Sequence, residues 1–510
     1  MSKRLLFGLI PLVLVAVACA PPPPPTFPLA SGQFLPQAVD FLSDTGRSPS
    51  IAVDSDGLPH LAYLGLNQKL KKGEIPPARP VTLPMIPAVL TATLTKSGVW
   101  NYGDVIATED QAKPLKLTAK DEVALAVDTS GNGHVAFTEE GVLKYAVQSG
   151  GSYGTPEKIA TGKVVGLSIA VDSKGTPWVS WLSGNRLEAA AKQGKTWKVQ
   201  DVTKISNQAS TSARTSIKAG PKGPVIAYSS GTTPTLATQS GKGWSTEKIQ
   251  PGGGGLGISL ALDSGGVPTV AYYTTSGDVR LAQSNGASWK VGTLGRAGRS
   301  NASGWSASVA VDKKGTPYVA WYDGKGDDVR MASGSGGSLK PIPITGTQNG
   351  ELPQVAVASD GSVVYVAWYD HLNLDLDMGT YGVTEKPPIA LAVPTPTTAA
   401  SPTAVQAQCK PTGSTIKVVA SGIAFDTNCL AATASKPFTI DFDNKDAGVP
   451  HNVEVYDTQG GKRLFGATSA TDTITGPATT TYKVTPQKPG TYYFQCDIHP
   501  TQMNGTFYVK

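Results

Sequence analysis

Four side chains near the C-terminus have the chemistry of metal ligands. Cys496, His499 and Met503 share the segment Cys-Asp-Ile-His-Pro-Thr-Gln-Met, and His451 lies upstream in Pro-His-Asn. One thiol, two imidazoles and one thioether form a soft, mixed ligand set. Thiolate and thioether suit Cu(I), and imidazole also serves Cu(II), so a rigid site of this kind changes little during electron transfer. The set predicts a mononuclear copper site.

Zinc is the main competitor for such ligands, but structural zinc sites rarely use Met. One Cys, two His and a weak axial Met form the arrangement of blue copper sites. Three of the ligands lie on one short loop and the fourth on a distant strand. This spacing predicts a metal held between the two sheets of a small sandwich.

The residues around these ligands have the pattern of such a sandwich. Short segments alternate apolar and polar residues and are separated by turns: TIKVVASGIAF, PFTIDFDN, HNVEVYD, TTTYKVT and GTYYFQC. Alternation with period two is typical of half-buried strands. We therefore expect a small antiparallel β-sandwich over residues 409–510.

This region resembles the cupredoxins, the plastocyanin-like family with type 1 (blue) copper. The resemblance is carried by DNKDAGVPHNVEVY, residues 443–456, and by GTYYFQCDIHPTQMNGTFYVK, residues 490–510. It implies a cupredoxin fold for residues 409–510, one copper ion and electron transport.

The resemblance also implies a role for each ligand. His451, Cys496 and His499 would be the strong ligands, and Met503 the axial one. Asn452 would be the amide that ties the two ligand segments together. His499 would be the ligand near solvent through which electrons pass.

The middle of the chain repeats one phrase: two or three small or apolar residues, Asp, a glycine turn and an apolar strand. The repeats begin at seven positions: Ser50, Ala124, Ser168, Ser216, Ser259, Ser308 and Gln354. After the first interval the starts lie roughly 45 residues apart, a period typical of four-stranded propeller blades. We predict an all-β chain with a seven-bladed β-propeller over residues 34–384.

Two features of the repeats lead to further expectations. The recurring Asp-x-x-Gly segments are predicted to be tight turns, in which Asp accepts backbone hydrogen bonds and Gly takes a positive φ. The last repeat lacks a fourth strand, and residues 34–42 precede the first repeat without a blade of their own. We expect these residues to complete the last blade and close the ring.

The propeller carries no recognisable catalytic set, and we expect no catalytic residue and no enzyme activity. A propeller followed by a cupredoxin resembles the layout of nitrous oxide reductase. That enzyme needs two cysteines in one copper loop and many propeller histidines. Here Cys496 stands alone, and only His60, His134 and His371 lie outside the C-terminal region. A basic, proline-rich insertion at about residues 64–87 is expected to protrude as a solvated loop.

The N-terminus has the pattern of an export signal. Lys3 and Arg4 precede an apolar run at 5–17, which is too short to span a membrane comfortably and ends in Ala-Val-Ala-Cys. This resembles a bacterial lipobox, which implies a signal peptide at 1–18 and a lipid on Cys19. The alternative is ordinary secretion, with cleavage after Ala18 or Ala20.

The segment that follows, residues 19–33, is rich in proline and is expected to be a stiff, extended spacer. We predict an exported lipoprotein that is anchored to a membrane and faces the periplasm or the cell exterior. A second segment rich in Pro, Ala and Thr, residues 385–408, is the expected linker between the two domains.

The chain contains four cysteines. If Cys19 carries lipid, three remain, and Cys496 is the one expected to bind copper. Cys409 and Cys429 would then form a disulfide, which requires the oxidising compartment that an export signal implies.

Composition agrees with this reading. Charged residues make up 16% of the 510 residues, and Gly 57 and Pro 39 are both frequent. This excludes a coiled coil or a large helical bundle. The net charge of +6 comes with no stripe rich in Lys and Arg, so we expect no nucleic-acid partner.

We therefore predict a monomeric electron-transfer protein with one type 1 copper and with redox partner proteins. The propeller would be the platform for a partner or ligand. One alternative is copper binding or delivery without redox turnover. Another is a propeller that serves adhesion, carbohydrate binding or an unrecognised hydrolysis, with an accessory copper domain.

Overall fold

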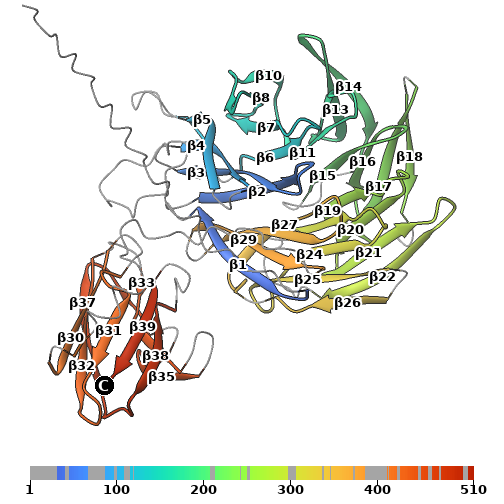
Figure 1. Cartoon of the computed structure of the whole chain (residues 1–510). Coiled ribbons are helices and arrows are strands. Elements are labelled where there is room, and N and C mark those ends of the chain that lie inside the picture. The colour runs from blue at the N-terminus through green and yellow to red at the C-terminus, as the bar shows by residue number, and fades with distance from the viewer. Residues whose placement is uncertain are drawn as a thin grey trace, which may run out of the picture.

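A computed structural model shows an all-β chain whose described residues form no helix. The described residues are 31–40, 45–66, 87–96, 100–107, 115–118, 120–206, 213–241, 243–249, 253–296, 306–335, 338–344, 346–371, 374–384, 410–411, 413–421, 425–445, 450–457, 462–469, 472–497 and 503–510. Within them, no helix is long and apolar enough to cross a membrane. The strands form two groups of sheets, one up to residue 384 and one from residue 415 (Figure 1).

In the described part of the first group, seven antiparallel sheets of four or five strands are found. Read from the inside outward, six of them are consecutive in sequence: β2(Thr45–Val53) β3(Pro59–Leu66) β4(Pro87–Leu94) β5(Trp100–Ala107); β6(Val123–Val127) β7(Gly133–Glu139) β8(Val142–Ser149) β10(Glu157–Thr161), with β9(Ser152–Tyr153) beside β8; β11(Val165–Val171) β12(Pro177–Ser183) β13(Arg186–Gln193) β14(Thr196–Lys204); β15(Thr215–Gly220) β16(Gly223–Ser230) β17(Thr233–Ser240) β18(Gly243–Lys248); β19(Gly254–Leu262) β20(Pro268–Thr274) β21(Asp278–Ser284) β22(Trp289–Arg296); and β23(Ala307–Val311) β24(Pro317–Asp323) β25(Asp328–Ser335) β26(Ser338–Ile342). The innermost strands contact one another in the cycle β2, β6, β11, β15, β19, β23, β27 and back to β2. This is the arrangement of a β-propeller (Figure 1).

The remaining sheet joins the two ends of the propeller segment. Its order is β27(Gly350–Val357), β28(Val363–Asp370), β29(Asp375–Gly382) and β1(Phe34–Asp40). β1 pairs antiparallel with β29 from Phe34 opposite Tyr381 to Asp40 opposite Leu376. The segment that precedes the first repeat therefore provides the fourth strand of the last repeat's sheet, as predicted.

The repeated aspartates build turns, as predicted. In each Asp-x-x-Gly turn, one carboxylate oxygen accepts the backbone N–H groups two and four residues later, at 2.8–2.9 Å. The glycine three residues after the aspartate has φ between 77 and 82° in all five turns. The five aspartates are Asp54, Asp128, Asp172, Asp263 and Asp312.

Serine hydroxyls link the innermost strands across the ring. The inner edge of each innermost strand has no neighbouring strand in its own sheet, so its N–H groups need other acceptors. Five serine hydroxyls accept an N–H of the next blade at 2.9–3.1 Å: Ser50 from Leu125, Ser168 from Ile217, Ser216 from Leu260, Ser259 from Val309 and Ser308 from Val355. Where the repeat has Ala124, the carboxylate of Glu122 accepts two N–H groups of β11.

The C-terminal group is a sandwich of two sheets. One sheet has the order β30(Thr415–Ala420), β32(Phe438–Asn444), β37(Ala478–Val484), and the other β31(Cys429–Ala432), β39(Asn504–Val509), β38(Gly490–Gln495), β34(Glu454–Tyr456), β35(Arg463–Gly466). A short pair, β33(Pro450–His451) and β36(Ile474–Thr475), lies beside them. Two pairs, β30 with β32 and β31 with β39, are parallel, so the sandwich is mixed and not wholly antiparallel.

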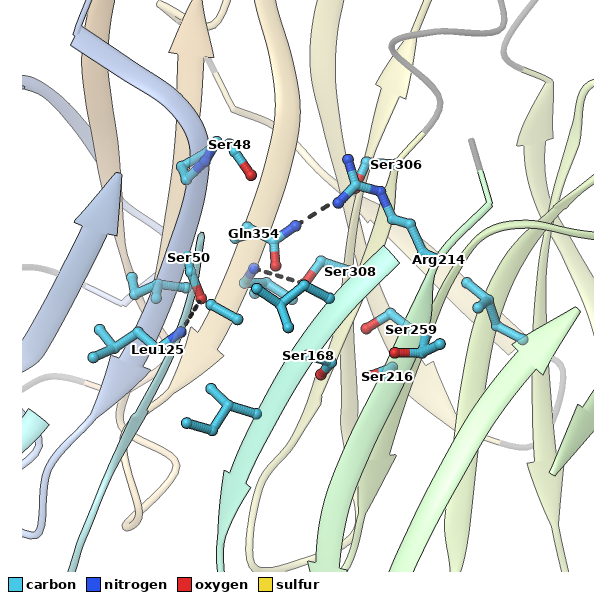
Figure 2. A pocket seen from close by; sticks show the side chains of 18 of the residues that line it. Ser48, Ser50, Leu125, Ser168, Arg214, Ser216, Ser259, Ser306, Ser308 and Gln354 are labelled. Atoms are coloured by element: carbon cyan, nitrogen blue, oxygen red, sulfur yellow. Dashed lines mark hydrogen bonds between the residues drawn. The ribbon is translucent and has the colours of Figure 1, made fainter. Parts of the chain in front are cut away.

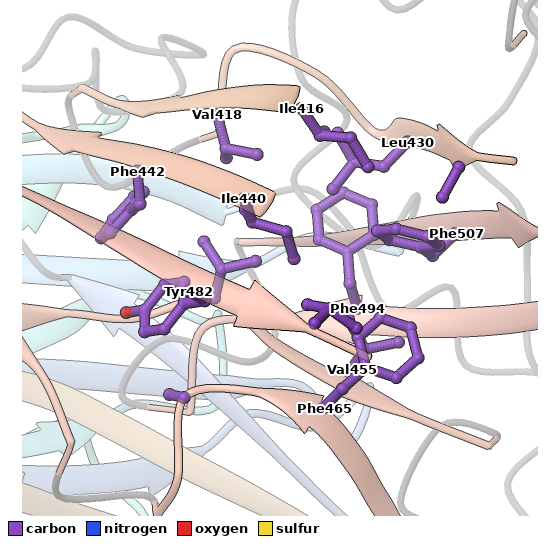
Figure 3. Close-up of a cluster of buried hydrophobic side chains, with 14 of the residues drawn as sticks. Ile416, Val418, Leu430, Ile440, Phe442, Val455, Phe465, Tyr482, Phe494 and Phe507 are labelled. Atoms are coloured by element: carbon purple, nitrogen blue, oxygen red, sulfur yellow. The ribbon is translucent and has the colours of Figure 1, made fainter. Parts of the chain in front are cut away.

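The core of this sandwich includes two of the predicted ligands. In β32 the residues alternate between buried and half-buried, which places Phe438, Ile440 and Phe442 inside. They pack with side chains of the opposite sheet such as Phe494 and Phe507 (Figure 3). Cys496 and Met503 belong to the same buried cluster.

Several predicted features lie outside the described residues. They are the signal peptide at 1–18, Cys19, the spacer up to residue 30, most of the insertion at 64–87, the linker 385–408, Cys409 and His499.

Deleting residues 34–42 should destabilise the propeller far more than deleting residues 20–28. Leu376 and Met378, fully buried on β29, would be exposed, and each buried side chain of this size contributes roughly 1.5–3 kcal/mol. The new sheet edge should also promote aggregation. All tryptophans lie between residues 100 and 368, so tryptophan fluorescence during denaturation measures the propeller. Equal unfolding midpoints for the two deletions would contradict the role assigned to β1.

Candidate metal centre

The structure brings two of the predicted ligands into contact. Cys496 follows β38 and His451 ends β33, and both residues are fully buried. Cys496 Sγ lies 3.6 Å from His451 Nδ1. β33 and the end of β38 are therefore placed so that the thiol and the imidazole face each other.

Met503 lies at the other end of the same loop and is also fully buried. The backbone N–H of Cys496 donates to the carbonyl of Met503 at 2.8 Å, just before β39 begins. This bond closes the loop between β38 and β39. Residues 496 and 503 are thereby held side by side, although seven positions separate them.

The contact between Cys496 and His451 has the spacing that a single copper ion requires. Metal–sulfur and metal–nitrogen bonds of about 2.3 and about 2.0 Å, at the angles of tetrahedral or trigonal sites, separate the two ligand atoms by roughly 3.6 Å. The observed separation of Sγ and Nδ1 is 3.6 Å. A thiol, an imidazole and a thioether in one dry core suit copper better than hard cations.

Within the described residues, no group of three or more His, Cys, Asp or Glu side chains is arranged so that it could hold a metal ion. That part of the chain includes Cys496 and His451 but not His499, and methionine is not among these residue types. The described part of the centre therefore consists of one thiol, one imidazole and one thioether.

Asn452 connects the two ligand segments. Its Nδ2 donates to Asp497 Oδ2 at 3.0 Å, and its Oδ1 accepts the backbone N–H of Asp497 at 2.8 Å. Asn452 follows His451 directly, and Asp497 follows Cys496. The two hydrogen bonds therefore fix the separation of the neighbouring ligands.

Asp497 is the centre of a polar cluster that the sequence reasoning missed. Its side chain is only 4% exposed. Besides Asn452, three side chains donate to its carboxylate: Arg463 Nη2 at 3.1 Å, Gln495 Nε2 at 3.2 Å, and the hydroxyl of Tyr456. Four side-chain donors hold this carboxylate beside the ligand loop. Its position directly after Cys496 was the only signal in the sequence.

Glu454 adds a second carboxylate to the cluster. Both of its oxygens are buried, and within the described residues neither accepts a hydrogen bond. Arg463 Nε lies 3.6 Å from Oε1. Burial raises the pKa of Glu454 to about 8, although the charge of Arg463 acts in the opposite direction. The protonated form is therefore favoured at neutral pH.

The cysteines differ in state. Cys429, at the start of β31, is disulfide-bonded, whereas Cys496 retains its thiol. The predicted partner Cys409 lies outside the described residues.

The propeller histidines do not join the metal centre. His60 Nε2 lies 3.1 Å from Asp54 Oδ2, and His134 Nε2 lies 3.4 Å from Asp128 Oδ2. Both aspartates belong to the repeated turns, so these two histidines support blade structure. His371 lies 3.4 Å from Asp327 on another edge of the propeller.

Comparison with known families agrees with the C-terminal fold. Residues 389–509 match a family model described as a cupredoxin-like domain. The match begins within the predicted linker, 20 residues before the boundary at 409, and ends at β39. The class defined by fold and site is thus a cupredoxin-like domain that follows a propeller-like domain. A comparison with curated proteins finds no match.

Three solved structures that are similar to the chain have low sequence identity to it and TM-scores below 0.5. A catalytically inactive virginiamycin B lyase from Staphylococcus aureus, solved with quinupristin, is 13% identical, with a TM-score of 0.44, over 68% of this chain and 99% of its own. A lectin variant from Aleuria aurantia with Fucα1-6GlcNAc is 17% identical, with a TM-score of 0.37, over 54% of this chain and 99% of its own. Reduced auracyanin from Roseiflexus castenholzii is 20% identical, with a TM-score of 0.17, over 19% of this chain and 98% of its own.

Replacing Asn452 with Ala should weaken copper binding by about 10- to 100-fold, the usual effect of losing a residue that orients metal ligands. The variant loses both hydrogen bonds between residue 452 and Asp497. The backbone N–H of Asp497 then lacks the acceptor that Asn452 Oδ1 provides. Titration with copper against a competing chelator measures the affinity. Gln487→Ala is the control, because within the described part of the chain this side-chain amide bonds only to the neighbouring Thr485. Equal affinities for both variants would contradict the bridging role of Asn452.

Replacing Glu454 with Gln should flatten the pH dependence of the sandwich's stability. The folded-state pKa of about 8 lies above the ordinary value of 4.5, so the folded state binds more protons. Stability is therefore full below about pH 4.5 and decreases as pH rises towards 8. The loss is on the order of a few kcal/mol, since one pKa unit corresponds to about 1.4 kcal/mol.

Amide hydrogen exchange of the sandwich strands in both proteins between pH 5 and 8 measures this difference. We expect the variant to gain stability over the native protein as pH rises. Parallel pH profiles would show that Glu454 is already ionised in the folded protein at neutral pH.

Proposed function

We propose that this chain is an exported electron-transfer protein with one type 1 copper in its C-terminal domain. The carrying observation is the buried contact of 3.6 Å between the Cys496 thiol and His451 Nδ1. Met503, buried in the same core, supplies the soft axial ligand, and His499 the second imidazole. In this proposal the protein is not an enzyme.

Cys496, His451, His499 and Met503 would hold the copper, which would carry one electron by alternating between Cu(I) and Cu(II). The protein keeps these ligands in one geometry for both oxidation states. The hydrogen bond from Cys496 N–H to Met503 keeps the loop closed, and Asn452 couples it to the His451 segment. Because these bonds are already formed, little rearrangement accompanies the transfer.

The buried surroundings of the thiol support electron transfer over copper delivery. A delivery protein must release its metal, which favours an accessible and adaptable site. Here Cys496, His451 and Met503 are all fully buried. Electrons would instead pass through His499, donated by one redox partner protein and accepted by another.

We further propose that the chain is a monomeric lipoprotein. Cys19 would carry the lipid after removal of residues 1–18, and Cys409 would pair with Cys429. The anchored protein would face the periplasm or the cell exterior and would bind no nucleic acid. The lipobox-like segment supports the lipid on Cys19. The disulfide state of Cys429 supports the pairing, which leaves Cys496 as the one remaining thiol for copper.

The propeller, which we take to have seven blades, is proposed as a platform for a partner or ligand. The runner-up function is adhesion or carbohydrate binding by the propeller, with copper in an accessory role. Binding assays with saccharides on variants without copper would separate these functions, because only the runner-up operates without the metal.

The purified protein should bind one copper and turn blue when oxidised, because a Cu(II)–thiolate bond absorbs strongly in the visible range. Cys496→Ser should abolish the band, since a serine oxygen cannot replace the thiolate. Met503→Leu should retain copper and shift the reduction potential, because the axial ligand tunes it. Visible and EPR spectra with a redox titration measure these effects.

Met331→Leu is a matched control, because Met331 is a buried methionine of the propeller. It should leave the spectrum and potential unchanged. An intense band that survives in Cys496→Ser would show that another group provides the thiolate. A copper that cannot be cycled reversibly would favour the delivery alternative.

A further inference from the structure

A polar cavity of about 100 Å³ lies at the centre of the propeller ring. Its lining comes from all seven innermost strands or the residues just before them, so it is the axial channel of the ring (Figure 2). At roughly 30 Å³ per water molecule, the cavity has room for a few waters or a small solute.

The serines that link the blades line this cavity. Each of the five hydroxyls already accepts a backbone N–H from the next blade. A hydroxyl also has one proton to donate. Within the described residues, no acceptor for these five protons is found. Figure 2 shows the hydroxyls of Ser50, Ser168, Ser216, Ser259 and Ser308 around the cavity. The channel therefore presents a ring of hydrogen-bond donors.

The charged residues of the lining are both cations. Arg214 precedes β15 and Lys218 lies on it, with Ser216 between them on the same face of the strand. No Asp, Glu or His is among the lining residues. Glu122, which occupies the position of Arg214 in another blade, lies outside the lining and is bonded to Gly166 and Leu167.

Lys218 is an exception in the repeat. Two residues after the start of each repeat, the other six blades have alanine: Ala52, Ala126, Ala170, Ala261, Ala310 and Ala356. Strand pairing confirms that the positions correspond, since Lys218 pairs with Val225 as Ala170 pairs with Trp178. None of the six alanines lines the cavity. In this blade a lysine thus stands where the other six blades have alanine, and its longer side chain reaches the channel.

The side chain of Lys218 lines the channel and is exposed there, and the surrounding ring lowers the pKa of its ammonium group by desolvation. Within the described residues, neither Lys218 nor Arg214 has an ion pair. An anion in the channel would compensate both charges and accept protons from the serine hydroxyls.

We propose that the axial channel of the propeller binds a small oxyanion, a phosphate, sulfate or carboxylate, between Arg214 and Lys218. The serine ring donates hydrogen bonds to its oxygens at the level of Ser216. This site is independent of the copper centre and identifies a ligand class for the propeller.

The test uses the full-length protein with inorganic phosphate, sulfate and succinate, at constant ionic strength set with sodium chloride. Tryptophan fluorescence during heating measures the propeller alone, since all tryptophans lie there. A ligand that binds only the folded state raises the unfolding temperature, and the rise grows with the logarithm of ligand concentration once the site is largely occupied. We expect one of the three anions to stabilise the propeller, and calorimetric titration to give its dissociation constant. Comparing the stabilisation by phosphate or sulfate with that by succinate shows whether the site prefers a mineral anion or a carboxylate.

Lys218→Ala restores the residue of the other six blades and should fold normally. It should weaken binding at least tenfold, and Lys218→Arg should retain it. Lys222→Ala, an exposed lysine in the following turn, is the matched control and should bind like the native protein. The proposal is overturned if none of the anions stabilises the propeller beyond chloride, or if Lys218→Ala binds the anion as tightly as the native chain. Binding of a neutral saccharide that Lys218→Ala leaves unchanged would also overturn it.

Discussion

The propeller depends on side-chain acceptors for the backbone N–H groups that no neighbouring strand can pair. Each innermost strand turns one edge towards the axis, and an unpaired buried N–H costs roughly 1–3 kcal/mol. In five blades a serine hydroxyl from the preceding blade accepts such an N–H. Between β6 and β11 a carboxylate does the same with two N–H groups. The same small residue thus satisfies the backbone, joins neighbouring blades and gives the channel its polar lining.

The C-terminal sandwich solves a related problem with a different side chain. The loop after β38 leaves the sheet, so the backbone N–H of Asp497 has no strand partner, and Asn452 accepts it at 2.8 Å. In both domains, a side chain of one segment bonds to the backbone of another at the point where strand pairing ends. In the ring the result is closure, and in the sandwich it is a fixed separation of two ligands.

The sequence was informative where a local pattern has one physical solution. Counting strands per repeat showed that residues 34–42 had to pair with the last blade, and β1 does so. The Asp-x-x-Gly segments predicted tight turns because aspartate accepts the backbone N–H groups of such a turn and glycine takes its positive φ. The candidate ligands could be proposed from the sequence because few sets combine a thiol, imidazoles and a thioether, and the structure brings Cys496 and His451 into contact.

The remaining features depend on which segments face one another. Alternation of apolar residues is the same in parallel and antiparallel pairs, so the parallel pair β30 with β32 could not be read from it. The cluster around Asp497 joins β34, β35 and the ligand loop, and no spacing in the sequence relates Arg463 to Asp497. Lys218 is visible as an exception among the repeats, but only the closed ring shows that it reaches the axis.

Closure of the ring also determines where the two outer segments of the chain leave the propeller. Gly32 donates its N–H to Gly382 at 2.8 Å, and Gly382 donates to Gln33 at 3.0 Å. The first and last described residues of the propeller are therefore neighbours. If Cys19 is anchored, the 12 residues up to Ser31 limit this point to roughly 40 Å from the lipid, at about 3.3 Å per residue. The linker to the C-terminal sandwich starts from the same point. Under the proposed function, a redox partner would therefore meet the copper within a limited distance of the membrane, whichever way the propeller is turned.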